Sequence, residues 1–138
     1  MLAVDTNILI RFLIDDTPEQ AVAVKALFSR EIIWIAKTVL LESAWALENL
    51  YGLAEGDIRE SFLRLLRLEN VRVEDDSSVL AALMLMEHGV ELADAMHLTS
   101  RPDAACGFVS FDRALVRRAS RAGVAEVFDL SARTKRLQ

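Results

Sequence analysis

The chain has 138 residues, of which 53% are hydrophobic and 27% are charged, and its net charge is −5. This length and composition fit one globular domain with its own core and exclude an intrinsically disordered protein. No stretch approaches the roughly 20 apolar residues of a membrane span, and the N-terminus lacks the pattern of a signal peptide. The single cysteine, Cys106, cannot form an internal disulfide. We therefore expect a cytoplasmic protein in which Cys106 is a small buried hydrophobe.

The charge is unevenly distributed along the chain. Residues 113–138 hold seven of the 16 Lys and Arg residues but only two of the 21 Asp and Glu residues. An acidic body with a basic C-terminal end is not typical of a non-specific nucleic-acid coat. It is compatible with an acidic metal site that has basic residues nearby to hold a polyanion.

Apolar runs alternate with helical patterns, which predicts an α/β domain with a parallel sheet. Thr17 is the expected cap of a helix that begins at Pro18, and Thr38 is the expected cap of the helix after the second strand. We expect one domain over residues 1–130 and a loose basic tail over residues 131–138. The predicted elements are, in chain order, strand 2–5, helices 7–14 and 18–30, strand 32–36, helices 38–51 and 53–68, strand 71–73, helices 77–88 and 92–100, strand 107–111, helix 113–122 and strand 126–128.

Four acidic residues lie near the predicted junctions between strands and helices. Asp5 and Asp112 end strands, Asp94 opens a helix, and Glu42 lies one turn into a helix. In an open parallel sheet, ligands bind beyond the carboxyl ends of the strands. If the first and fourth strands are neighbours, Asp5 and Asp112 face each other, and Glu42 and Asp94 can reach the same space. Carboxylates gathered in this way repel unless a cation lies among them, and their oxygens suit Mg²⁺ or Mn²⁺.

Each carboxylate also has an ordinary explanation. Asp5 and Asp112 can cap helices, and Asp94 and Glu42 can complement helix dipoles. Glu42 fits this explanation least well, because its apolar neighbours predict a semi-buried face on which an unpaired charge is unfavourable. The acidic run Glu74-Asp75-Asp76 is predicted to be a solvated turn that feeds a helix N-terminus.

Several polar residues next to the four carboxylates have possible supporting roles. Thr6, Asn7 and Ser110 either serve turns and caps or support the metal ligands and a bound water. His97 lies one turn after Asp94 and is either satisfied within the helix packing or close to the site. Three arginines are spaced for one face of the helix that follows Asp112, where they either form a solvated face or contact the phosphates of a polyanion: Arg113, Arg117 and Arg121.

Four segments of the sequence resemble the acidic motifs of PIN-domain ribonucleases, in the order and spacing of VapC-type toxins. They are Val4-Asp5-Thr6-Asn7-Ile8-Leu9, Leu41-Glu42-Ser43, Ala93-Asp94-Ala95-Met96-His97-Leu98 and Val109-Ser110-Phe111-Asp112-Arg113. The first and last motifs are specific, and the middle two gain weight from their order. Ser110 stands where the family often has threonine, which preserves the hydroxyl.

The resemblance implies a three-layer α/β/α fold around a central parallel sheet of four or five strands. It also implies Mg²⁺- or Mn²⁺-dependent cleavage of RNA, a homodimer, and inhibition by a cognate antitoxin protein. By match of motif, Asp5, Glu42, Asp94 and Asp112 are the catalytic and metal-binding residues. The resemblance covers nearly the whole chain but does not indicate which RNA is cut.

Competing functions fit the sequence less well. A phosphoacceptor signalling domain would need an acidic pair after the first strand, where Asp5-Thr6-Asn7 has a single carboxylate. A nuclease that cuts DNA and a non-catalytic binding module with the same fold remain as alternatives.

The helix predicted over residues 38–51 is apolar around much of its circumference. A surface helix needs only one apolar stripe, so this helix either is deeply buried or forms a self-association or antitoxin surface together with Phe62 and Leu66. The apolar residues of this helix are Val39, Leu40, Leu41, Ala44, Trp45, Leu47, Leu50 and Tyr51.

Overall fold

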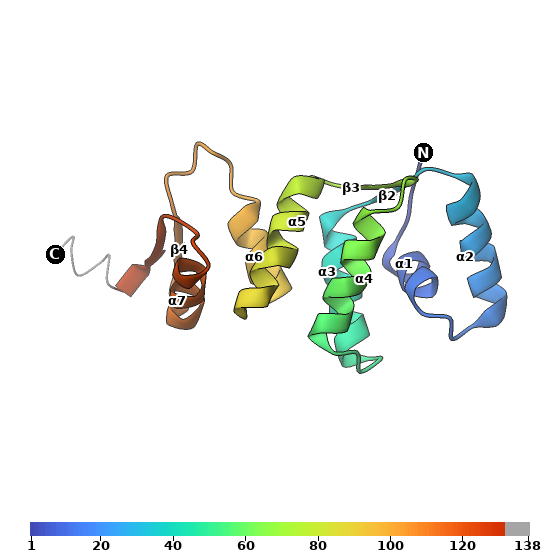
Figure 1. The fold of residues 1–138 in the computed structure, drawn as a ribbon, viewed down its shortest axis with the longest axis horizontal. Helices are drawn as coiled ribbons and strands as arrows, with labels where there is room; N and C mark the ends of the chain where they lie inside the picture. Colours follow the sequence, from blue (N-terminus) through green and yellow to red (C-terminus); the bar gives the residue numbers. More distant parts are fainter. Residues whose placement is uncertain (132–138) are drawn as a thin grey trace. The chain divides into compact units, whose positions relative to one another are not determined.

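A computed structural model describes residues 1–131 of the chain, which form helices and five short strands (Figure 1). Its residues divide into two compact units, Met1–Leu80 and Ala81–Gln138. Every strand pairing is parallel, which confirms the predicted α/β fold class. Most of the predicted basic tail, residues 132–138, lies outside the described residues.

The first unit contains a three-stranded sheet in the order β1-β2-β3. Its register places Leu2 opposite Ile33, and Ile33 opposite Val71. Ile33 and Ile35 point to the same face of β2 and are fully buried, whereas Trp34 on the other face is half-buried. The elements of this unit are β1 (Leu2–Ala3), α1 (Thr6–Leu13), α2 (Pro18–Arg30), β2 (Ile33–Ile35), α3 (Lys37–Asn49), α4 (Glu55–Leu66) and β3 (Val71–Val73).

In the first unit, α1 packs against both α2 and α3, and α3 packs against α4. The rings of Phe12 and Phe28 stack with their centroids 3.9 Å apart, which joins α1 to α2. Each large aliphatic side chain that is fully buried in such a core contributes roughly 1.5–3 kcal/mol to stability. The largest buried side chains of this unit are Leu9, Ile33, Ile35, Leu40, Leu47, Phe62 and Leu65.

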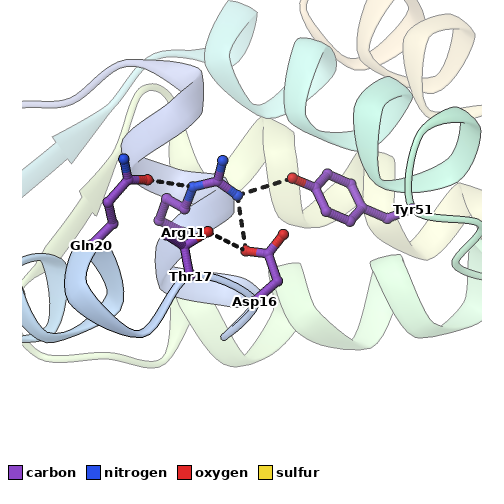
Figure 2. A network of polar contacts seen from close by, with 5 residues as sticks. All are labelled: Arg11, Asp16, Thr17, Gln20 and Tyr51. Carbon is purple, nitrogen blue, oxygen red and sulfur yellow. Dashed lines mark hydrogen bonds and ion pairs between the residues drawn. The ribbon is translucent and has the colours of Figure 1, made fainter.

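A polar network centred on Arg11 fixes the connection between α1 and α2 (Figure 2). Its guanidinium group donates to Asp16 at 2.9 Å, to the Gln20 side chain at 2.8 Å and to the Tyr51 hydroxyl at 3.0 Å. The Tyr51 contact, followed by the nearby Asp16 charge, raises the pKa of Arg11 above its ordinary value. One cation thus ties together residues that precede α2, belong to α2 and follow α3.

The second unit contains a two-stranded parallel sheet, in which Phe108 lies opposite Val127. Gly107 is required beside this pair, because a Cβ atom there would lie 2.9 Å from the Phe128 ring. Helix α5 (Asp76–Leu85) crosses the boundary between the units. The remaining elements are η1 (Met86–His88), α6 (Leu92–Thr99), β4 (Phe108–Ser110), α7 (Arg113–Arg121) and β5 (Val127–Asp129). The five strands predicted for one central sheet are thus described as two sheets, one in each unit.

The structure corrects two predictions of local structure. Thr38 does not cap its helix, because α3 begins one residue earlier at Lys37 and its N-cap position is Ala36. Cys106 is exposed in the loop before β4, so it is not the buried hydrophobe that its apolar neighbours predicted. Among the described residues, no helix is long and apolar enough to cross a lipid bilayer.

Candidate active site

Asp5 stands between the end of β1 and the start of α1. It is exposed, with extended backbone angles, and its Oδ1 accepts a hydrogen bond from the N–H of Ile8 at 3.1 Å. The capping role considered from the sequence is therefore real. It uses one of the two carboxylate oxygens, so capping and ligand binding are compatible. Thr6 and Asn7 form the first turn of α1 directly after Asp5, Thr6 half-buried and Asn7 exposed.

Asp112 repeats this arrangement in the second unit. It follows β4, and its Oδ1 caps α7 by accepting a hydrogen bond from the N–H of Leu115 at 3.0 Å. Its own backbone N–H donates to the hydroxyl of Ser110 at 3.0 Å. Ser110 therefore supports the turn from which the Asp112 side chain projects.

Asp94 lies in the first turn of α6 and is half-buried. Asp94 and Asp112 line the same small cavity, of about 90 Å³, within the second unit. Its complete lining is Val90, Glu91, Asp94, Asp112, Leu115 and Arg118. Two of the four predicted carboxylates are thus brought together with a third carboxylate and a guanidinium group.

Glu42 lies in the middle of α3 and is exposed. The prediction of a semi-buried face for Glu42 is wrong, because the buried side of α3 is formed by Leu40, Ser43, Ala46 and Leu47. Helix α3 packs against α1, the helix that Asp5 caps. Asp5 and Glu42 therefore belong to packed elements of the first unit. His97, predicted to be either packed or near the site, is exposed in the last turn of α6.

The acidic run after β3 has a structural role in the first unit. Glu74 accepts a hydrogen bond at 2.9 Å from the backbone N–H of Lys37, the first residue of α3. The ammonium group of Lys37 lies 2.9 Å from Asp75, whose backbone is left-handed with φ 49°. The hydrogen bond from Lys37, supported by Ser78, lowers the pKa of the Asp75 carboxyl. Asp76 begins α5, as expected of a turn that feeds a helix.

The three arginines predicted to share one face of α7 line one cavity of about 420 Å³ between α7 and β5. Arg113 is held by Asp129, with its Nε 3.3 Å from the Asp129 Oδ2. The cavity lining is completed by Val116, Ser120 and Val127. This surface, which we call the arginine groove, combines three cationic side chains with two valines.

The donor set of the smaller cavity fits a hard divalent cation. Carboxylate oxygens are the ligands that Mg²⁺ and Mn²⁺ prefer, and Mg²⁺ is commonly bound by one or two carboxylates together with substrate phosphates. Asp94 and Asp112 supply such a pair. Within residues 1–131, no three His, Cys, Asp or Glu side chains are grouped in a way that could hold a metal ion. Asp5 and Glu42 belong to one unit, and Asp94 and Asp112 to the other.

A sequence model of the PIN domain family matches residues 2–121. The chain belongs to the PIN domain family. The matched range covers all four acidic motifs and ends with α7. PIN domains are generally nucleases and generally use divalent metal ions, so a nuclease-type function follows for this PIN domain. Comparisons with curated proteins and with solved structures found no match.

Two residues of the PIN-domain cavity were missed from the sequence, Glu91 and Arg118. Both follow from helical spacing once the elements are known. Glu91 precedes Asp94 by about one helical turn. Arg118 follows Leu115 by about one turn of α7, the helix whose N-terminus Asp112 caps. The three arginines at every fourth position predicted a ligand-binding face on another side of α7, which does not include Arg118.

Proposed function

We propose that this PIN domain is a metal-dependent endoribonuclease and the toxin of a toxin–antitoxin pair. The observation that carries the nuclease part is the shared cavity of Asp94 and Asp112. Two carboxylates that line one polar cavity repel each other, and a divalent cation bound there would remove this repulsion. The toxin part rests on the resemblance to VapC-type toxins in motif order and length.

We include Asp5 and Glu42 in the same metal site. The order and spacing of the four acidic motifs, which resemble those of VapC-type toxins, support this assignment. All four motifs lie within the range that the PIN family model matches.

The chemistry divides between the cation and the chain. When bound, a divalent cation activates water and neutralises charge on the phosphodiester. Asp5, Asp94 and Asp112 would hold it directly or through water, and Glu42 would either bind it or orient the attacking water. The helix caps at Asp5 and Asp112 each fix one carboxylate oxygen, which directs the other oxygen. Ser110 supports Asp112, and Thr6 and Asn7 support the Asp5 turn.

We assign RNA binding to the arginine groove. Arginine pairs well with phosphate because its planar guanidinium group can donate two parallel hydrogen bonds. Arg113 borders both the groove and Asp112, so a strand lying in the groove is led toward the acidic cavity. The partial neutralisation of Arg113 by Asp129 leaves Arg117 and Arg121 as the main cations of this contact.

We also propose a homodimer and a cognate antitoxin as protein partners. Trp45 on α3 and Leu50 at its C-cap are 59% and 70% exposed, which supports a self-association surface there. This surface is smaller than the sequence suggested, because Phe62 is 1% exposed and belongs to the core. Light scattering of the wild type and of Trp45→Ala tests the dimer, and Val22→Ala, at another exposed apolar residue, is its control.

The nuclease assignment is tested with a single-stranded RNA and a DNA of the same sequence. We expect cleavage of the RNA with Mg²⁺ or Mn²⁺, loss of cleavage with chelator, and recovery when Mn²⁺ is restored. Asp112→Asn should be inactive, whereas Asp103→Asn in an exposed loop should remain active. Activity of Asp112→Asn in the presence of chelator would exclude the metal mechanism, and cleavage of the DNA alone would exclude the ribonuclease.

A further inference from the structure

Arg118 lines the acidic cavity together with Glu91, Asp94 and Asp112. It lies on a different side of α7 from the arginine groove, whose lining does not include it. Its side chain passes close to Gly89: a Cβ atom on Gly89 would lie 3.7 Å from the Arg118 Nε and 3.8 Å from its Cδ. These are ordinary van der Waals distances, so the Arg118 side chain lies against this turn, and the φ of 80° is what favours glycine at position 89.

Arg118 is an exposed residue of the cavity lining and forms no ion pair with the carboxylates that share this lining. Among residues 1–131, the ion pairs within 4.0 Å do not include Arg118. If Arg118 formed a permanent salt bridge, its guanidinium group could not bind a ligand, and the paired carboxylate would be less available to a metal ion. The observed arrangement instead keeps a guanidinium group beside the carboxylates and leaves its donors for another acceptor.

A divalent cation held by Asp94 and Asp112 would repel Arg118 unless an anion lay between the two positive charges. A phosphoryl group meets this requirement, because one oxygen can face the metal while another accepts hydrogen bonds from arginine. The guanidinium fork suits this geometry and holds its charge at every physiological pH.

We propose that Arg118 contacts the scissile phosphate of the RNA at the acidic cavity. Its partners are the non-bridging phosphoryl oxygens, and its role differs from that of Arg117, which contacts the strand away from the cleaved bond. The inference rests on the proposed nuclease function and deepens it by naming the residue that binds the reacting group.

The test compares wild type with Arg118→Gln, Arg118→Lys, Arg117→Gln and the control Arg64→Gln. The first readout is binding of Mn²⁺ by calorimetry, followed by binding of inorganic phosphate to the Mn²⁺-loaded protein. Arg118→Gln should bind Mn²⁺ more tightly than wild type, because a neighbouring positive charge is gone, and should lose phosphate binding. Arg118→Lys should keep part of it, and Arg64→Gln, which changes an exposed arginine of α4, should behave as wild type in both measurements.

The second readout is cleavage under saturating RNA. Arg118→Gln should lower kcat by roughly 100-fold, as loss of a donor to a developing charge does elsewhere, while Arg117→Gln should mainly raise KM. Unchanged phosphate binding and kcat in an Arg118→Gln protein that melts like wild type would overturn the assignment of Arg118 alone. Absence of Mn²⁺ binding by wild type would overturn the proposed function, and this inference with it.

Discussion

The hydroxyl of Ser110 accepts a hydrogen bond from the backbone N–H of Asp112, with 3.0 Å between the two atoms. The last residue of β4 thereby fixes the turn that leads into α7. Because Asp112 projects from this turn, we expect the hydroxyl to hold the direction of its carboxylate. The positioning role proposed for Ser110 rests on this hydrogen bond.

Ser110→Ala should reduce cleavage while Ser110→Thr should retain it. The alanine variant loses one hydrogen bond, worth about 1 kcal/mol, and leaves the Asp112 turn less constrained. Steady-state cleavage and urea unfolding of both variants provide the measurement. Equal activity of the alanine and threonine variants would show that the hydroxyl does not position Asp112.

Asp112→Asn and Asp112→Ala should separate the capping role of Asp112 from its metal-binding role. Asparagine caps helices about as well as aspartate, whereas alanine does not and is less stable by about 1 kcal/mol. Both variants should be inactive, but only Asp112→Ala should show a lower free energy of unfolding in chelator. If the two variants unfold alike, the hydrogen bond from Leu115 contributes nothing to the stability of α7.

Much of this local architecture was predictable from sequence. The helix Pro18–Arg30 and the strand Val71–Val73 have the bounds that their start signals and apolar patterns predicted. The start of α3 was not predictable, because the acceptor for the Lys37 N–H is Glu74, which lies far along the chain. A local search for a cap therefore selected the adjacent Thr38.

The candidate site was predictable in part for a similar reason. Asp94 and Asp112 each follow a recognisable local pattern, and the fold places them in one cavity. Arg118 carries no motif, and its relation to the carboxylates depends on how α7 packs against η1. The exposure of Glu42 likewise depends on which side of α3 the neighbouring helices cover, and its apolar neighbours in sequence gave the wrong side.

Asp94→Asn should stabilise the metal-free protein by about 1 kcal/mol, because it removes one of the like charges in the cavity. Arg118 offsets part of this repulsion but cannot neutralise Glu91, Asp94 and Asp112 together. Thermal unfolding in chelator should show the higher Tm for the variant, and added Mg²⁺ should stabilise wild type more than the variant. A lower Tm of the metal-free variant would argue against electrostatic crowding.

Asp75 should stabilise the folded protein at neutral pH and should lose this contribution in acid. Its folded-state pKa lies below the ordinary value of 3.8, mainly because Lys37 donates to its carboxylate. The contribution is therefore fully present well above pH 3.8 and is lost as the pH falls through the lower folded-state value. Asp75→Asn tests this without adding strain, since asparagine tolerates the left-handed backbone.

The measurement is urea unfolding of wild type and Asp75→Asn from pH 7 down to pH 3. The variant should be less stable at pH 7, and the difference should shrink as the pH falls below about 3.8. Asp15→Asn is the control, because the Lys25–Asp15 pair is longer, at 3.3 Å, and more exposed. A difference that stays constant with pH would mean that the Lys37–Asp75 pair does not stabilise the charged form.

Arg117→Ala should weaken RNA binding and flatten its salt dependence by up to about 1 unit of log slope, because one phosphate contact releases about one counterion. We choose Arg117 for this test because removal of Arg113 would also leave the Asp129 carboxylate without its arginine partner. Binding is measured in chelator to prevent cleavage, over a series of salt concentrations, with Arg64→Ala on α4 as the control. An unchanged slope for Arg117→Ala would make the arginine groove an ordinary solvated helix face.

The two helix caps have a consequence for how related sequences are interpreted. Asp5 and Asp112 each hold the first turn of a helix in place, so a relative that had lost its catalytic activity would still be selected for a capping residue there. Such a relative would keep aspartate at these positions or replace it with asparagine, serine or threonine. The motif would therefore remain recognisable after the activity was lost. Glu42 caps no helix and is exposed. Its replacement is therefore the more informative mark of a degenerate enzyme.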